Sequence, residues 1–542
     1  GAIEAYLSIQ VALSALDRLE VRGRDSAGIH VLVTGHGLDL DAPDLVAQMA
    51  PRLGDRLFTS GAVRAPGGAL SFVYKAAAEI GELGDNGAAL RAAIRGDGLL
   101  RRALSGESAE ATVLGHTRWA SVGIISQANA HPLNSEEATG PARPYVTAAL
   151  NGDVDNYVAL REEAGLAIPP EVTSDAKIIP ALVAHRLDAG DDPDDAFRAT
   201  VARFDGSVAI AASIAAQPDR LHLALRGSGQ GLYVGLAEDA FVVASEPYGL
   251  VEETSRYLRL DGEATAGQVV VLDRSEAGTV AGIRRLAYDG TELPVAAEEL
   301  ATAEVTTRDI DRAGYPHFLL KEITEAPQSF RKTLRGRVVE RHGLLRVELG
   351  PEALPPALVD RLAAGAVRRI LVIGQGTAAV AAQSVAASLQ RCISGRGPTV
   401  GAVLATELSG FELVDDMSDT LVVAVSQSGT TTDTNRTVDL VRGRGATVVA
   451  IVNRRNSDLV DRSDGVIYNS DGRDVEMAVP STKAFYAQVA AGFVLALALA
   501  DELDCGDADE AHDILSSLRA IPDAMEQVLA RRDAIAVAAH RY

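Results

Sequence analysis

The sequence contains little cysteine and no long uninterrupted apolar run. Only Cys392 and Cys505 occur in 542 residues, and neither has metal-ligand spacing, so we expect no disulfide framework, no metal site and a reducing, cytoplasmic compartment. The stretch AAGFVLALALA (490–500) is too short for a membrane span, which needs about 18 apolar residues, and we expect no signal peptide at the amino end.

Basic residues are also scarce relative to acidic ones. With 51 Lys and Arg against 74 Asp and Glu, the formal net charge is -23 and the pI is near 4.9. Nucleic acid is therefore excluded as a general partner, because phosphate backbones are bound by an excess of Lys and Arg. Small molecules are the expected ligands, and the chain is long enough for at least two domains.

The first 300 residues combine many short β-rich pieces with a few helical ones. Apolar residues recur at helical spacing over 4–20, which predicts a helix. Short apolar strands continue to about residue 300, which indicates an antiparallel, layered α+β domain. Between about 35 and 110, the segments 68–84 and 87–104 are interpreted as helices inserted between strands.

After residue 300 the pattern changes. Residues 307–334 indicate a connecting helical region that Pro316 and Pro327 interrupt. Beyond it, apolar strand candidates alternate with helical segments, which is typical of a parallel doubly wound sheet. The strand candidates are 368–374, 401–405, 420–426, 447–453 and 465–469.

Three loops of this later domain are rich in glycine and hydroxyl side chains. VIGQGTAAVAA (372–382) and AVSQSGTTTDT (424–434) each begin in a strand candidate, and AVPSTKAF (478–485) lies at a helix entrance. Helix N-termini present N–H groups with a partial positive charge, so hydroxyls there can add donors to a phosphate. Helix capping explains one such loop, whereas three at the strand ends of one sheet favour a phosphorylated ligand. The candidate ligand residues are Thr377, Ser426, Gln427, Ser428, Thr431 and Ser481.

The first of these loops also fits a second type of site. Gly374, Gly376 and Ala379 match the relaxed dinucleotide fingerprint G-x-G-x-x-A. A dinucleotide site needs an acidic residue about 20 residues on, at the end of the next strand, and Glu407 comes somewhat later than that. A dinucleotide site is therefore the weaker alternative.

Blocks of sequence along the whole chain resemble one known family. The SQSGTT loop, with GQGT upstream and PSTKAF downstream, resembles the phosphosugar-binding sugar isomerase (SIS) domain. The other blocks resemble the glutaminase half and the interdomain connector of the glutamine:fructose-6-phosphate amidotransferases, also called glucosamine-6-phosphate synthases. These blocks are RLEVRGRDSAG (18–28), GHTRWASVG (115–123), NAHP (129–132), LNGDVDNYVALREE (150–163), SDAKII (174–179) and GYPHFLLKEITEAPQSFRKTLRGR (314–337).

The resemblance implies a domain organisation. Residues 1–300 would form a class II glutaminase domain with the four-layer αββα fold of N-terminal nucleophile enzymes, carrying a helical insert near 35–110. A connector over 301–337 would lead to an α/β doubly wound SIS domain over 338–505, in which the hydroxyl loop holds the sugar phosphate. Residues 506–542 are expected to be a helical segment that leads to a second SIS domain outside this sequence.

The resemblance also implies roles for residues of the glutaminase half. Asn151 and the Gly152 N–H would form the oxyanion hole, where fixed donors stabilise charge that develops on the attacked carbonyl. Arg118 would pair with the α-carboxylate of glutamine and Asp175 with its α-ammonium, and Ser121 would add a hydrogen bond. For Arg118 and Asp175 the alternative is a surface ion pair.

At several positions the sequence departs from the family. The family begins Cys-Gly-Ile and uses that Cys as nucleophile with its own α-amine as base, whereas this sequence begins GAI, so the Cys is expected one place before Gly1. Further residues are expected to be missing before the first helix. Trp119, the only tryptophan, matches the residue that closes the ammonia route, with a plain core aromatic as the alternative. Val122, Leu150 and Ala378 stand where the family usually has His, His and Ser, so we expect a different pocket polarity.

These expectations describe a glutamine-dependent amidotransferase that makes glucosamine 6-phosphate from fructose 6-phosphate and glutamine. We expect a homodimer that binds glutamine and a phosphosugar, with no metal, no redox cofactor, no nucleic acid and no membrane. A catalytically silent, sugar-phosphate-binding regulator is one alternative, and the residue ahead of Gly1 separates it from the enzyme. An amidotransferase that acts on another phosphosugar is the other, and product analysis separates it.

Overall fold

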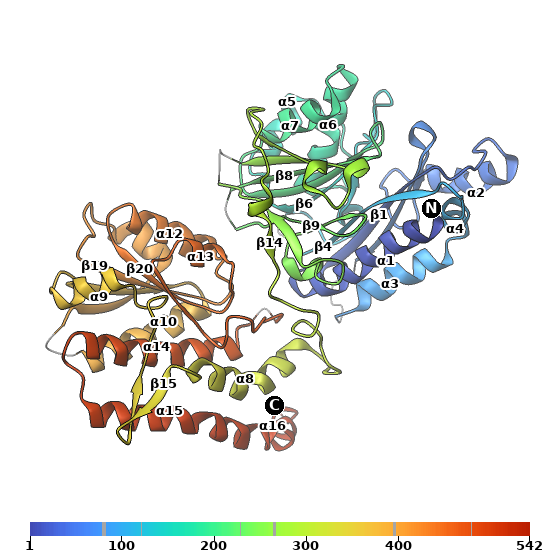
Figure 1. Cartoon of the computed structure of the whole chain (residues 1–542). Coiled ribbons are helices and arrows are strands. Elements are labelled where there is room, and N and C mark those ends of the chain that lie inside the picture. The colour runs from blue at the N-terminus through green and yellow to red at the C-terminus, as the bar shows by residue number, and fades with distance from the viewer. Residues whose placement is uncertain are drawn as a thin grey trace. The chain divides into compact units, whose positions relative to one another are not determined.

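The computed structural model describes residues 1–77, 83–120, 122–227, 229–263, 267–393, 397–478 and 480–541. The chain divides into two compact units, Gly1–Thr307 and Arg308–Tyr542. In Figure 1 the first unit is coloured blue to green, and the second runs from yellow-green to red.

The first unit contains seven α-helices and fourteen strands among its described residues. The helices are α1 (Ala2–Leu19), α2 (Pro43–Leu53), α3 (Asp85–Gly96), α4 (Gly98–Leu104), α5 (Tyr157–Glu163), α6 (Ile178–Asp188) and α7 (Pro193–Val201). The strands are β1 (Ser26–Thr34), β2 (Val63–Arg64), β3 (Leu70–Ala77), β4 (Glu110–Arg118), β5 (Leu133–Asn134), β6 (Val146–Gly152), β7 (Val208–Ile214), β8 (Arg220–Arg226), β9 (Tyr233–Leu236), β10 (Phe241–Ala244), β11 (Arg256–Arg259), β12 (Gln268–Asp273), β13 (Ile283–Ala287) and β14 (Ala301–Thr302).

Three sheets organise this unit. Their strand orders are β2-β3-β1-β4, β13-β12-β8-β7-β6-β5 and β10-β9-β11-β14, and the described pairings are antiparallel. On β1, Ile29, Val31 and Val33 alternate toward a core shared with helices α1 to α4. His30 points to the opposite face, where its ring contacts Thr147 of β6. The first two sheets therefore face one another.

The second of these sheets is covered by helices on its far side. On β7, Val208, Ile210 and Ile214 pack in one core with residues of α6 and α7. The unit thus has a helix layer, two facing sheets and a second helix layer, and Figure 1 shows α1 and α3 near β1 and α6 near β6 and β8.

One secondary-structure prediction for this unit is wrong. Residues 68–84 are predicted to be helical, but Leu70–Ala77 forms the inner strand β3, paired with β1, and 78–82 lie outside the described residues. Alternation explains the strand, because Leu70, Phe72 and Tyr74 share a core with α1 while Ser71 and Lys75 point the other way. The helix predicted over 4–20 is confirmed as α1, and the one over 87–104 as α3 and α4.

The second unit contains nine α-helices and seven strands among its described residues. The helices are α8 (Phe318–Leu334), α9 (Pro356–Ala363), α10 (Thr377–Cys392), α11 (Ala405–Glu407), α12 (Thr432–Arg442), α13 (Asp458–Asp461), α14 (Lys483–Glu502), α15 (Ala508–Leu529) and α16 (Arg532–Ala539). The strands are β15 (Val338–Arg341), β16 (Leu344–Val347), β17 (Arg369–Gly374), β18 (Thr399–Leu404), β19 (Thr420–Ser426), β20 (Thr447–Val452) and β21 (Gly465–Tyr468).

A five-stranded parallel sheet forms the centre of this unit. Its order is β18-β17-β19-β20-β21, which confirms the predicted parallel sheet, and each predicted strand lies within two residues of the observed one. Strand β19 is buried along its whole length, as expected for an inner strand with helices on both faces. The helix α8 begins after Pro316 as expected, but it runs through Pro327, which was predicted to interrupt it.

Helix α14 is the most apolar long helix of the second unit. Among the described residues it alone is long and apolar enough to cross a membrane, yet 72% of its apolar window is buried inside the unit. It packs against α10 and α8, so its apolar surface is covered by protein. The stretch 490–500, which is too short for a span by itself, is the core-facing part of this helix.

Candidate functional site

The strand order of the parallel sheet defines one edge where a ligand is expected to bind. From β17 the chain crosses to β18 on one side and then returns to β19 on the other, so the connections diverge between β17 and β19. In open parallel sheets, ligands bind at such a switch point, outside the carboxyl ends of the strands. The loops that follow β17 and β19 are the two predicted glycine- and hydroxyl-rich loops.

The loop after β19 is stabilised by its own hydroxyl groups. The buried Ser426 hydroxyl accepts a hydrogen bond from the Gly429 N–H at 3.0 Å. The Ser428 hydroxyl accepts from the Thr430 N–H at 3.2 Å and from the Thr430 hydroxyl at 3.0 Å. Thr431 is the N-cap of α12 but makes no side-chain capping bond. The loop is therefore a compact turn with Thr431 at the helix N-terminus.

The loop after β17 brings a second helix N-terminus to the same edge. Thr377 is the first residue of α10, and Gly376 before it has a φ of 58°. A Cβ on Gly374 would lie 2.8 Å from the Ala378 carbonyl oxygen, so strand and helix approach closely. The predicted residues Thr377, Ser426, Gln427, Ser428 and Thr431 are thus on two adjacent loops of one sheet edge.

Ser481 has a different environment. It precedes α14, and its hydroxyl donates a hydrogen bond to Glu476 at 2.9 Å. Among the described residues, no hydrogen bond links Ser481 to the loop of Ser426 and Thr431. The predicted third loop therefore lies between β21 and α14 and is held by a carboxylate.

In the first unit, two predicted glutamine-binding residues are buried and charged. Arg118, at the end of β4, is 5% exposed, and its guanidinium donates to the carbonyls of Val122 and Ile124. Asp175 is 4% exposed and accepts the Val154 N–H at 2.9 Å. Burial lowers the pKa of Arg118 while nearby Asp175 opposes that shift, and burial raises the pKa of Asp175. The surface ion pair considered for these residues is therefore wrong.

The predicted oxyanion residues lie at the end of β6. Asn151 pairs with Ala209 of β7 and is exposed, and Gly152 has a φ of 104°. A Cβ on Gly152 would lie 2.0 Å from the Ser207 carbonyl oxygen, so only glycine fits there. Two residues further on, the Val154 N–H donates to Asp175, which links this strand end to the segment of Asp175.

Trp119 and Ser121 complete the predicted set. Trp119 is 64% exposed, so the alternative of a plain core aromatic is wrong. Ser121 lies outside the described residues.

Two buried residues support this region, and the sequence did not assign them a role. The His131 ring contacts the Leu150 carbonyl and the Ser174 hydroxyl, each at 3.1 Å, so it joins the segments that carry Asn151 and Asp175. The Asn129 carboxamide oxygen accepts the Ser174 N–H at 2.9 Å and a second N–H at 2.7 Å. Both residues belong to the NAHP block, which was the available signal.

The amino group of Gly1 lies away from these residues. It pairs with the Glu4 carboxylate at the start of α1, and a Cβ on Gly1 would lie 2.9 Å from the Glu107 carbonyl oxygen. Glu107 precedes β4, whereas Arg118 ends it, and a nine-residue strand is roughly 27 Å long. Neither Cys392 nor Cys505 is in the first unit.

Comparisons with known proteins give matches in both units of the chain. The SIS domain family matches residues 366–498, which include the sheet edge with the hydroxyl loop. A glutamine–fructose-6-phosphate aminotransferase (isomerizing) of Streptomyces coelicolor is 32% identical over 430 residues, covering 79% of this chain and 64% of its own length. The enzyme of that name from Corynebacterium diphtheriae is 30% identical over 529 residues, covering 97% of this chain and 71% of its own.

The chain thus spans less than two thirds of the length of the Streptomyces relative. Among solved structures, the C-terminal domain of glucosamine-fructose-6-phosphate aminotransferase from Francisella tularensis is 24% identical. It covers 42% of this chain and 59% of its own, with a TM-score of 0.36.

Proposed function

Because this chain belongs to the glutamine–fructose-6-phosphate aminotransferase (isomerizing) family, we propose that it takes part in glutamine-dependent synthesis of an amino sugar phosphate. Glutamine is hydrolysed in the first unit, and the ammonia is used to convert fructose 6-phosphate into glucosamine 6-phosphate. One observation carries this proposal: the similarity runs through 97% of the chain and therefore includes both the Arg118 and Asp175 blocks and the SIS domain.

The second unit would hold the phosphosugar at the edge between β17 and β19. Support comes from the two helix N-termini at that edge, since their N–H groups and dipoles favour an anion. The phosphate would contact Ser428, Thr431 and Thr377, while Ser426 would keep the turn closed and Gln427 would reach the sugar. Ser481 would contact the ligand from the entrance of α14.

The first unit would be a glutaminase with the N-terminal nucleophile fold. Its two facing antiparallel sheets between helix layers support that proposal. Arg118 would bind the α-carboxylate of glutamine and Asp175 its α-ammonium, because a buried charge gains most from a ligand of opposite sign. Asn151 and the Gly152 N–H would stabilise the oxyanion, with Trp119 and Ser121 alongside.

The amidotransferase would act as a cytoplasmic homodimer. Its nucleophile would be a cysteine whose α-amine is its base, as the resemblance implies. Gly1 lies at the far end of β4 from Arg118, so the predicted position of this cysteine directly before Gly1 is wrong. The isomerase acid and base groups would belong to a second SIS domain, so the present residues supply binding of the sugar phosphate rather than its isomerisation.

The test uses the natural protein and amide-labelled [15N]glutamine. Intact-mass analysis gives its first residue and its length, and incubation with fructose 6-phosphate is followed by mass spectrometry of the products. Labelled glucosamine 6-phosphate is expected. If another ketose phosphate is aminated instead, the substrate assignment is wrong. If fructose 6-phosphate binds in calorimetry without glutamate release, the protein is a sugar-phosphate-binding regulator.

A further inference from the structure

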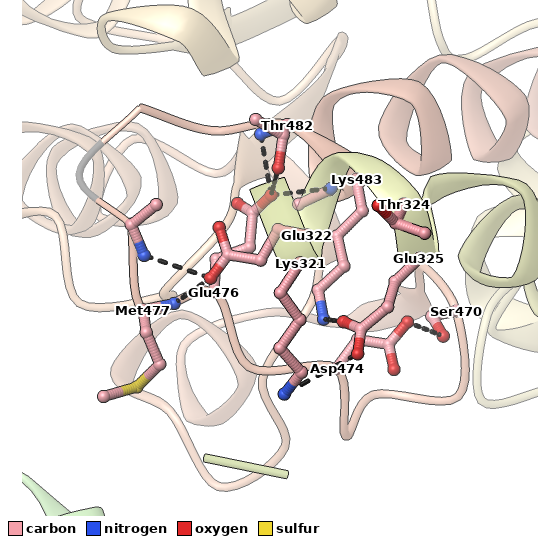
Figure 2. Close-up of polar contacts among 12 residues, drawn as sticks. Lys321, Glu322, Thr324, Glu325, Ser470, Asp474, Glu476, Met477, Thr482 and Lys483 are labelled. Atoms are coloured by element: carbon pink, nitrogen blue, oxygen red, sulfur yellow. Dashed lines mark hydrogen bonds and ion pairs between the residues drawn. The ribbon is translucent and has the colours of Figure 1, made fainter. Parts of the chain in front are cut away.

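A cluster of charged side chains joins helix α8 to the segment that leads into α14. Figure 2 shows Glu322 and Glu325 of α8 beside Glu476 and Lys483. Lys483 pairs with Glu325, whereas Glu322 and Glu476 accept hydrogen bonds from backbone N–H groups. This segment, 469–482, runs from the end of β21 to the entrance of α14 and contains Ser481. We call it the entrance segment.

Glu322 binds the backbone of the entrance segment directly. Its Oε1 accepts the N–H of Met477 at 2.5 Å and the N–H of Ala478 at 3.0 Å. The side chain is 1% exposed, and its Oε2 has no hydrogen-bond partner among the residues that the structure describes. A carboxylate that accepts two successive backbone N–H groups fixes the direction of the chain at that point.

A second carboxylate, Glu476, fixes the other end of the same turn. Its Oε1 accepts the Thr482 N–H at 2.7 Å and the Ala484 N–H at 3.0 Å, and its Oε2 accepts the Ser481 hydroxyl. Glu476 therefore caps the N-terminus of α14. Residues on both sides of Ser481 are held by carboxylates, one of them supplied by α8.

Further contacts join α8 to this segment and to the start of α14. Lys483 forms an ion pair with Glu325 at 2.6 Å, one turn along from Glu322. Near the other end of α8, Lys332 pairs with Asp474 at 3.0 Å, and the Thr333 hydroxyl accepts the Ser470 N–H at 2.7 Å. These contacts attach the segment to α8 at both ends of the helix.

We propose that Glu322 is a positioning residue for phosphosugar binding: it orders the backbone before Ser481, so that the entrance segment meets the ligand without further ordering. This inference rests on the proposed function of the second unit. Fixing one residue's backbone costs about tenfold in an equilibrium constant, so ordering it before binding raises the affinity by a similar factor.

The charges around Glu322 give the proposal a measurable signature. Burial, and to a smaller extent Glu476, raises the pKa of Glu322 to about 7, while Lys483 and the two backbone N–H groups oppose that rise. On its own helix the neighbouring charged groups are Lys321 and Glu325. From α15, Asp523 and Glu526 face α8 but pair with Arg331. From the entrance segment, Asp474 pairs with Lys332. Both protonation states of Glu322 are therefore populated near neutral pH, and only the ionised one forms charge-assisted bonds.

The experiment measures fructose 6-phosphate binding by calorimetry, with inorganic phosphate as a second probe, for the native chain and for Glu322→Gln and Glu322→Ala. Ser329→Ala is the matched control, because Ser329 is buried on α8 and its hydroxyl has no hydrogen-bond partner among the described residues. At pH 8 we expect about tenfold weaker binding for Glu322→Gln and about thirtyfold for Glu322→Ala, against native affinity for the control. At pH 6 the native and Glu322→Gln affinities converge.

Stability separates this role from a merely structural one. Because the folded-state pKa of Glu322 is raised, its contribution to stability is full below the unfolded pKa and is lost as pH rises through about 7. At pH 8 the Glu322→Gln chain is therefore expected to unfold at the same urea concentration as the native chain or higher, while it binds more weakly.

Each outcome is informative. Native affinity in Glu322→Gln at pH 8 overturns the positioning role, and so does an affinity deficit that is unchanged at pH 6. If Glu322→Ala fails to fold, Glu322→Gln still decides the question. If the native chain binds neither probe, the proposed function of the second unit fails instead.

Discussion

Replacing Gly429 with alanine tests the geometry of the loop after β19. Gly429 has a φ of 67°, and a Cβ there would lie 2.0 Å from the Ser457 Oγ and 2.6 Å from its Cβ. An alanine in the left-handed region costs about 1–2 kcal/mol, and overpacking against a fixed neighbour adds about 1–3 kcal/mol. We therefore expect Gly429→Ala to lower the free energy of unfolding of the second unit by about 3 kcal/mol.

Gly365→Ala provides the matched control. Gly365 has a φ of 66°, but its Cβ would meet no atom within 4 Å. The control therefore carries the backbone penalty alone, about 1 kcal/mol. The difference between the two variants measures the contact with Ser457. A third variant, Gly429→Ala with Ser457→Gly, removes the obstructing side chain and should recover part of that difference.

Thermal unfolding measures these differences. The single tryptophan, Trp119, lies in the first unit, so its fluorescence follows that unit, while far-ultraviolet circular dichroism follows both. One kcal/mol shifts the midpoint by about 2–4 °C in a unit of this size, so Gly365→Ala should lower it by about 3 °C and Gly429→Ala by about 9 °C. Equal shifts in the two variants would refute the packing argument.

The remaining predictions concern the first unit. Lys75 is buried, its Nζ has no hydrogen-bond partner among the described residues, and burial lowers its pKa to about 7. Between pH 7 and 10.5 the unfolded chain binds a proton at Lys75 that the folded chain does not, so the free energy of unfolding should rise with pH. Lys75→Met should flatten this pH dependence in urea unfolding and add about 2–4 kcal/mol of stability at pH 7. Parallel pH profiles of the two chains would contradict this. Asn129→Ala leaves at least two N–H groups unpaired, so we expect about 2–4 kcal/mol lower stability and weaker glutamine binding in calorimetry. Asn86 is a buried amide whose side chain donates to the Arg24 carbonyl, so Asn86→Ala is the control. It should leave glutamine binding unchanged.

Sequence patterning predicted the second unit better than the first. Each strand of the parallel sheet is a short apolar run. In the inner strands β19 and β20, burial on both faces leaves that run nearly uninterrupted. The prediction failed at β3, where a lysine and two alanines end an alternating pattern. Alanine favours helices in isolation, but pairing with β1 and β2 overrides that preference.

The loops of the second unit could be assigned from sequence, whereas the surroundings of the buried charges in the first unit could not. Hydroxyls after β17 and β19 could be assigned because strand ends of a parallel sheet meet at one edge. The surroundings of Arg118 and Asp175 could not be read from sequence, since His131 and Asn129 act through buried contacts between segments far apart in the chain. Those contacts exist only once the sheets are packed.

The burial of the Glu322 carboxylate is not explained by a contribution to folding stability alone. In the sequence Glu322 is one polar residue of a helix that was predicted to be a connector, where charged side chains ordinarily face water. In the structure it is buried, its pKa is raised to about 7, and one of its oxygens has no hydrogen-bond partner among the described residues. A neutral side chain of the same length would avoid the cost of that burial. If folding were its sole role, the ionised form would be a net disadvantage, so the gain is expected elsewhere, in the ordered backbone that it presents before Ser481.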